Sequence, residues 1–148
     1  MNELASLVLA YKPSGAVSEL MQKIRMVGIF GITGAGKDTI ISKMLSNGRY
    51  HPIITTTTRE PRAGEKNDVD YHFITLGEAR RMLEAGEYVE VASIHGQQIS
   101  GATISEFRAA QANGKIAITD LNLEGVESYK KLAPQTIAIF VIPPNYKE

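Results

Sequence analysis

The spacing of apolar residues changes along the chain from a helical period to a strand-like one. The first 24 residues carry two stripes at i, i+3, i+4 and i+7, which predict two short amphipathic helices separated by Pro13-Ser14-Gly15. The stripes consist of Leu4, Leu7, Val8 and Tyr11, and of Val17, Leu20, Met21 and Ile24. We expect them to be packing surfaces, with a partner-binding arm as the alternative.

From residue 24 onward, strand-like and helix-like stretches alternate. The predicted strands cover residues 26–30, 52–58, 71–74, 88–93, 116–121 and 136–142, and the predicted helices cover residues 37–45, 75–85, 103–112 and 124–132. Thr75 and Glu78 form a capping box at the start of one helix. The alternation predicts an α/β fold with a parallel core sheet and a buried final strand. The half-polar strands between Tyr71 and Ser93 indicate a small inserted subdomain.

A glycine-rich turn follows the first of these strands. Its sequence, with the start of the next helix, is Gly31-Ile32-Thr33-Gly34-Ala35-Gly36-Lys37-Asp38-Thr39. This pattern is typical of a phosphate-binding P-loop, in which glycines let backbone N–H groups converge on an anion and the lysine reaches the β- and γ-phosphates. We therefore expect ATP to be bound by Gly31, Gly34, Ala35, Gly36, Lys37, Asp38 and Thr39. A plain turn between a strand and a helix is the alternative.

The residue after the lysine departs from the strict P-loop pattern. Asp38 stands where Ser or Thr is expected, and Thr39 follows one position later. The hydroxyl at that place usually binds Mg²⁺, and a carboxylate offers the same kind of hard oxygen ligand. We expect Asp38 and Thr39 to bind Mg²⁺. Nucleotide binding should depend strongly on the metal, because the carboxylate alone would repel the phosphates.

The composition of the chain argues against several classes of partner and binding site. The 148 residues suffice for one domain, and Lys+Arg and Asp+Glu balance at 16 each, so no overall field favours nucleic acid or an anionic membrane. The absence of cysteine excludes disulfides and thiolate metal sites. No apolar stretch approaches the roughly eighteen residues needed to span a bilayer, and the first residues contain no basic leader. These features predict a cytoplasmic protein.

A second polar constellation follows the strand predicted at residues 52–58. It reads Thr55-Thr56-Thr57-Thr58-Arg59-Glu60-Pro61-Arg62-Ala63-Gly64-Glu65, and then Asp70-Tyr71-His72-Phe73. Two arginines three residues apart can direct planar, paired donors at one phosphate, and Tyr71 adds a hydroxyl. The alternative is that both arginines pair on the surface with Glu60, Glu65 or Asp68.

Together with the P-loop, this segment resembles the guanylate kinase family, P-loop enzymes that transfer the γ-phosphate of ATP to GMP. The string Thr-Thr-Arg-x-Pro-Arg-x-Gly-Glu with the following Asp-Tyr-x-Phe is a specific signature, and the resemblance runs from about Met26 to Pro144. Gly114-Lys115, Asp120, Gly125-Val126 and Pro143-Pro144 follow in the family's order. The resemblance implies a P-loop NTPase fold of three α/β/α layers over residues 25–148. Its core would cover about 25–54 and 103–148, an NMP-binding insertion about 55–102, and residues 1–24 would form a helical extension.

The resemblance also implies roles for individual residues. Lys37, Arg59 and Arg62 would be the catalytic residues, and Asp120 would lie near the magnesium ion and the lysine. Glu90 would accept hydrogen bonds from the guanine N1 and N2 groups. The implied site for the acceptor nucleotide consists of Thr55, Arg59, Arg62, Tyr71, Glu90 and Asn122.

The sequence departs from the family pattern at three places. The stretch Gly96–Thr103 reads one residue longer than the family's loop, with Ile99 or Ser100 at the place of a tyrosine and Ala102 at that of a hydroxyl. Asn122 replaces an aspartate, so guanine selectivity stays open. The chain also ends before the family's arginine-bearing lid and its last strand and helix. We expect either a truncated product or a homodimer, with the N-terminal helices covering the bare side of the sheet.

Two other functions remain open on the sequence. A kinase of the same fold that phosphorylates a phosphorylated sugar, as ribose bisphosphate kinases do, would fit the Gly-Lys-Asp junction and the altered base pocket. A non-catalytic guanylate-kinase-like module that binds phosphorylated peptides would fit the missing lid, but not the intact Lys37 loop.

Overall fold

The computed structural model describes residues 2–32 and 34–144 and contains two compact units. The inserted unit, as we call it, comprises the chain up to Glu19 and residues Ile54–Glu106. The core unit comprises Leu20–Ile53 and the chain from Phe107 onward. Helix α2 (Gly15–Met21) lies across the first point of division. Each unit is described by itself below.

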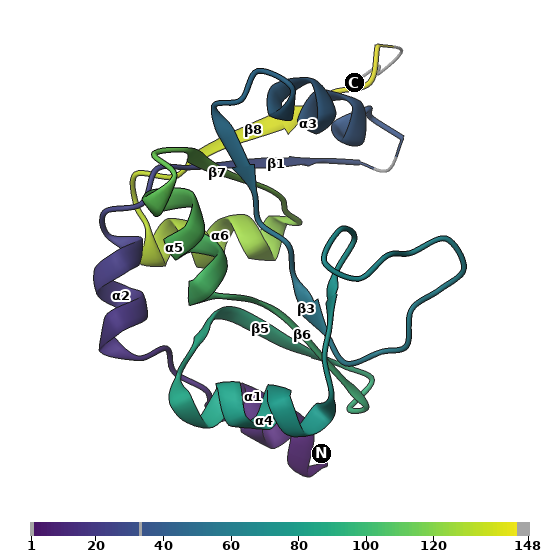
Figure 1. The fold of residues 1–148 in the computed structure, drawn as a ribbon, viewed down its shortest axis with the longest axis vertical. Coiled ribbons are helices and arrows are strands. Elements are labelled where there is room, and N and C mark those ends of the chain that lie inside the picture. Colours follow the sequence, from purple (N-terminus) through teal and green to yellow (C-terminus); the bar gives the residue numbers. More distant parts are fainter. Residues whose placement is uncertain (1, 33, 145–148) are drawn as a thin grey trace. The chain divides into compact units, whose positions relative to one another are not determined.

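The core unit contains a four-stranded parallel sheet. Its strands are ordered β2 (Tyr50–Pro52), β7 (Ile116–Asp120), β1 (Met26–Gly31) and β8 (Ile137–Val141). Figure 1 shows α3 (Lys37–Leu45) on one side of this sheet and α6 (Leu123–Leu132) on the other. Parallel strands joined through helices on both faces confirm the predicted α/β class.

Helix α3 packs on the sheet through its apolar side. Ile40, Ile41, Met44 and Leu45 cover a buried cluster that contains Val27, Ile29, Ala35, Ile118 and Val141. Elsewhere in the core unit, Phe107 of α5 (Ile104–Ala112) and Tyr129 of α6 are both buried, and their ring centroids lie 6.0 Å apart. These contacts fix the end of β1, from which the glycine-rich turn departs.

The prediction that the last strand is buried was wrong. Ile137 is 60% exposed and Phe140 is 50% exposed, and only Val141 of β8 is buried. The strand stands at the end of the order β2-β7-β1-β8, so it has a hydrogen-bonded neighbour on one side only. The apolar composition of β8 therefore led to a wrong prediction of its burial.

The inserted unit contains a smaller, mixed sheet. Its order is β4 (His72–Phe73), β3 (Thr56–Thr57), β6 (Gln98–Thr103) and β5 (Tyr88–Ile94), in which β3 and β4 are parallel and the other pairs antiparallel. Helices α1 (Glu3–Ala10) and α4 (Leu76–Ala85) lie together beside β5 (Figure 1). Leu4, Ala79, Tyr88 and Ile99 form the buried cluster. The capping box of Thr75 and Glu78 at α4 is present as predicted.

Two strand predictions in this region need correction. Residues 52–58 do not form one strand: the chain leaves β7 after Ile53, whose N–H donates to the Ile118 carbonyl, and joins the other sheet at Thr56. Strand β6 was not predicted, because its glycine and polar residues read as a loop. His95 and Gly96 both have positive φ (53° and 65°), and the Gln97 N–H donates to the Ile94 carbonyl, so a tight hairpin turn joins β5 to β6.

The two helices predicted in the first 24 residues are present, and α1 packs with the inserted unit. Among the helices of the described residues, none is both long and apolar enough to cross a bilayer.

Candidate functional site

The turn after β1 depends on two glycines. Gly34 and Gly36 have φ values of +81° and +94°, in the left-handed region where other residues are strained. Gly36 is the N-cap residue of α3, and Lys37 is the first residue of that helix. The turn therefore brings the positive end of α3 and the lysine to the same place.

The lysine lies beside an aspartate from the neighbouring strand. Because β1 and β7 run parallel, with Ile29 opposite Asp120, both strands deliver their last residues to one edge of the sheet. Lys37 Nζ lies 3.1 Å from Asp120 Oδ1. A pocket of about 420 Å³ opens here, lined by Gly34, Gly36, Lys37, Asp38, Thr39 and Asp120. The structure thus brings together most of the residues that the sequence assigned to ATP and metal.

The donor set of this pocket suits a phosphate accompanied by a hard cation. Lys37 and the amino end of α3 supply positive charge, while Asp38, Thr39 and Asp120 offer oxygen ligands. Within the described residues, no group of three or more His, Cys, Asp or Glu side chains is placed to hold a metal alone. A Mg²⁺ ion here would take further ligands from phosphate and water, which is its usual mode of binding beside nucleotides.

Two of the predicted ATP-binding residues shape the turn and do not line the pocket. Gly31 ends β1 so close to β8 that a Cβ atom would lie 2.5 Å from the Val141 carbonyl oxygen. Ala35 is buried in the core cluster, and its N–H donates to the Ile32 carbonyl (3.1 Å). Gly31 and Ala35 are therefore small because neighbouring atoms pack closely around them.

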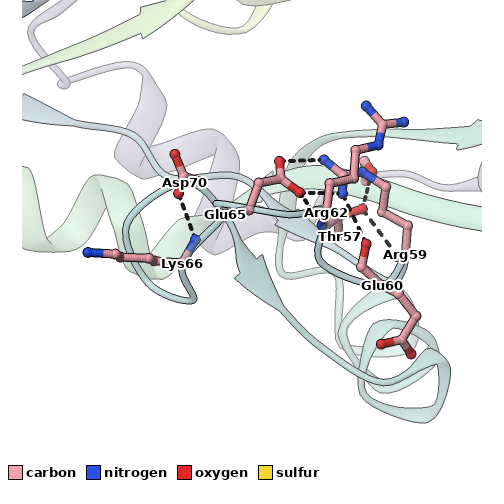
Figure 2. A network of polar contacts seen from close by, with 8 residues as sticks. Thr57, Arg59, Glu60, Arg62, Glu65, Lys66 and Asp70 are labelled. Atoms are coloured by element: carbon pink, nitrogen blue, oxygen red, sulfur yellow. Dashed lines mark hydrogen bonds and ion pairs between the residues drawn. The ribbon is translucent and has the colours of Figure 1, made fainter.

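The first arginine of the second constellation is held by a carboxylate. Arg59 and Glu65 form a two-pronged ion pair, with N–O distances of 2.7 and 2.8 Å (Figure 2). The Arg62 backbone N–H donates to the same carboxylate at 2.7 Å. The hydrogen bonds from Arg59 and then Arg62 lower the pKa of Glu65 to about 2, and the bond to Glu65 raises the pKa of Arg59. The side chains of Arg59 and Glu65 are only 13% and 20% exposed.

Two aromatic rings complete the surroundings of Arg59. Its guanidinium carbon lies 4.9 Å from the ring centroid of Tyr71 and 5.9 Å from that of Phe73. Such contacts favour a guanidinium over an ammonium. Arg59 is therefore fixed in direction, whereas the side chain of Arg62 is exposed.

The other predicted acceptor residues fall in both units. Thr55, Tyr71 and Glu90 belong to the inserted unit with the two arginines. Burial raises the pKa of the Glu90 carboxyl, against a hydrogen bond from the Ala102 backbone. Asn122 belongs to the core unit, where its Oδ1 accepts the Gly125 N–H (2.7 Å) and caps α6.

Sequence reasoning missed an ionic cluster next to the arginine loop. The imidazole of His72 contacts Asp68 through Nδ1 (2.7 Å) and Glu106 of α5 through Nε2. Burial lowers the pKa of His72, but the bonds to Glu106 and Asp68 outweigh it, so the pKa is raised. The spacing of Asp68 and His72 could have suggested their contact, whereas no local pattern indicates Glu106.

Comparison with known proteins gives one consistent result. The sequence model described as "Guanylate kinase" matches residues 23–148. A guanylate kinase of Sus scrofa is 38% identical over 123 residues, which are 82% of this chain and 62% of that protein. One from Mycobacterium leprae is 33% identical over 90% of this chain and 64% of that protein. The crystal structure of guanylate kinase from Anaplasma phagocytophilum superposes with a TM-score of 0.61, at 23% identity, over 81% of this chain and 61% of that one.

The match covers most of this chain but less of its relatives. The chain spans less than two thirds of the length of the Sus scrofa and Mycobacterium leprae proteins. The structural likeness supports the P-loop α/β fold, and the family sequence model covers residue 23 to the last residue. With the Lys37–Asp120 pocket and the arginine signature inside that range, the chain belongs to the guanylate kinase family.

Proposed function

We propose that this chain is an ATP-dependent phosphotransferase that moves the γ-phosphate of ATP to GMP. The observation that carries the proposal is the Lys37–Asp120 pocket at the amino end of α3, in a chain of the guanylate kinase family. The relatives from Sus scrofa and Mycobacterium leprae both bear the name guanylate kinase, which favours GMP over a sugar phosphate as the acceptor.

In this proposal the pocket binds the donor. Lys37 and the backbone N–H groups at Gly34 and Gly36 contact the phosphates of ATP. Asp38, Thr39 and Asp120 would hold Mg²⁺, which would supply positive charge beside the transferring phosphoryl group. Asp120 also keeps the Lys37 ammonium in place, since the two groups already lie 3.1 Å apart.

The inserted unit binds the acceptor. Arg62, with its exposed side chain, and Arg59, fixed by Glu65 and Tyr71, contact the GMP phosphate. Glu90 accepts hydrogen bonds from the guanine base, with Thr55 as a further contact and Asn122 assigned to the same site. An oxygen of the GMP phosphate forms a bond to the γ-phosphorus while the bond to the ADP oxygen breaks. Positioning and charge neutralisation carry this reaction without a covalent enzyme intermediate.

The direct test is ADP release with ATP, Mg²⁺ and GMP. Lys37→Ala should lower kcat by at least about 100-fold, because a fixed charge on the transferring group is lost. Lys43→Ala is the matched control, since Lys43 lies in the last turn of the same helix. GMP-dependent turnover in Lys37→Ala equal to that of the parent chain would refute the assignment.

The role of Mg²⁺ and the choice of acceptor have separate measurements. ATP affinity should fall sharply with excess chelator, because Asp38 then repels the phosphates, and Asp38→Ser should reduce that dependence.

Replacing GMP by ribose phosphates should abolish ADP release. Equal release with a base-free acceptor would favour the sugar-phosphate kinase, and a chain that fails to bind ATP would favour the non-catalytic module.

A further inference from the structure

The N-terminal segment, which precedes the family match at residue 23, is anchored to the inserted unit at separate points. Asn2 donates its amide to the Gly96 carbonyl (2.6 Å), at the turn between β5 and β6. Glu3 pairs with Arg80 of α4 at 3.0 Å, and the Ser14 N–H donates to the Gly86 carbonyl at 3.1 Å. Leu4 is buried in the apolar cluster of that unit. Helix α1 is therefore part of the unit that holds the proposed acceptor site.

Tyr11 contacts Tyr88 of β5, two residues before Glu90. Its hydroxyl donates to the Tyr88 carbonyl at 2.6 Å, and its ring packs edge-on against the Tyr88 ring with centroids 6.2 Å apart. Burial raises the pKa of Tyr11 to about 12, so the hydroxyl keeps its proton and remains a donor at neutral pH.

Tyr88 lies where the ladder between β5 and β6 changes register. Tyr88 pairs with Thr103 and Glu90 pairs with Ala102, so the register shifts between Tyr88 and Glu90. Irregularities of this kind change the direction of nearby side chains, and Glu90 is the residue at which pairing with β6 resumes. The Tyr88 hydroxyl lies 3.3 Å from Thr56 Oγ1, so Tyr88 is held from both its backbone and its side chain.

We propose that Tyr11 is a positioning residue for Glu90. Through Tyr11, its C-cap residue, helix α1 contributes to the acceptor site. The hydroxyl of Tyr11 fixes the Tyr88 carbonyl at the register shift, and that shift directs the Glu90 carboxylate. The inference rests on the proposed function, because it assumes that Glu90 contacts the guanine base.

The test compares affinities for GMP and AMP by calorimetry on the full chain. The variants are Tyr11→Phe, Glu90→Gln, the double variant, and Tyr50→Phe of the core unit as the matched control. Tyr11→Phe keeps the ring and loses one hydrogen bond, so GMP affinity should fall about fivefold. AMP affinity, which depends on the arginines, should not change, and Tyr50→Phe should match the parent chain. In the Glu90→Gln background, Tyr11→Phe should produce no further loss of GMP affinity.

Each other outcome overturns a specific part. Tyr11 does not act through Glu90 if Tyr11→Phe lowers the affinities for GMP and AMP by the same factor. The same holds if Tyr11→Phe leaves the ratio of the two affinities unchanged while Glu90→Gln abolishes the preference for GMP. The proposed function then still stands. If Glu90→Gln leaves the ratio of GMP to AMP affinity unchanged, the proposed base contact fails, and the inference fails with it.

Discussion

Glu65 holds together the arginine-bearing loop that the sequence marked as a phosphate site. Its carboxylate accepts hydrogen bonds from the Arg59 guanidinium and from the Arg62 backbone. The pairing of Arg59 with Glu65 was the structural alternative for this segment. The structure contains this pair, and Arg59 keeps further N–H hydrogens for a ligand. An ion pair and a phosphate site are therefore compatible at this residue.

The low pKa of Glu65 predicts a loss of stability in acid. The hydrogen bonds from Arg59 lower that pKa to about 2. The ion pair therefore stabilises the fold fully above the ordinary glutamate pKa, about 4.3, and loses this effect as the pH falls toward 2. Melting temperatures at pH 6 and pH 3 should differ less in Glu65→Gln than in the parent chain. Glu60→Gln, an exposed carboxylate of the same loop, is the control and should behave like the parent chain. An equal acid response in Glu65→Gln would contradict this assignment.

At the scale of elements, His72 connects the arginine loop to helix α5. Its ring contacts Asp68 of the loop and Glu106 in the first turn of the helix. The loop also carries strain, because Asp68 adopts a positive φ of 64°. The cluster therefore fixes the loop end next to Tyr71 through charge.

The raised pKa of His72 predicts a pH dependence of opposite sign to that of Glu65. The stabilisation is fully present below the unfolded histidine pKa, about 6.5, and is lost as the pH rises through the raised folded value. The melting temperature of the parent chain should exceed that of His72→Gln more at pH 6 than at pH 9. His95→Asn, in the exposed hairpin turn, provides the control. A constant difference between the parent chain and His72→Gln would exclude the charged cluster.

The elements show where sequence reasoning succeeds and where it ends. Helix α3 was predicted with its observed bounds, and β1 nearly so, because local spacing, caps and glycines determine them. Strand β6 was not predicted because its glycine and polar residues read as a loop, and one of its two partner strands, β3, lies far away in the sequence. For the same reason, residues 52–58 looked like one strand although they pair in two different sheets. In the candidate site, the glycine-rich turn and its lysine could be predicted from the local sequence. Glu106 and Tyr11 could not, because their contacts are with residues far away in the sequence.

At the scale of the whole molecule, the exposed apolar side chains of β8 are the most unusual feature. Phe140 packs against Phe30 with ring centroids 5.1 Å apart, yet Phe140 and Ile142, the residue after β8, remain half exposed. Contiguous apolar surface on an edge strand favours association with another chain. This property fits the homodimer that was one of the two alternatives from the sequence, the other being a truncated product.

We therefore predict concentration-dependent self-association of the chain. Sedimentation velocity should show a growing dimer fraction with concentration, and the combined Phe140→Ser and Ile142→Ser substitutions should remove it. Leu9→Ser, a change at an even more exposed apolar residue of α1, should leave it unchanged. A parent chain that sediments as a monomer at every concentration would contradict the prediction.

Helix α1 lies before the start of the family match but inside the inserted unit. The family model matches from residue 23, whereas the inserted unit already includes Leu4 and Tyr11. A chain shortened to the residues that the family model matches would lose Leu4 and expose Ala79 and Tyr88 to water. The inserted unit therefore depends for its packing on a segment outside the range that the family model matches.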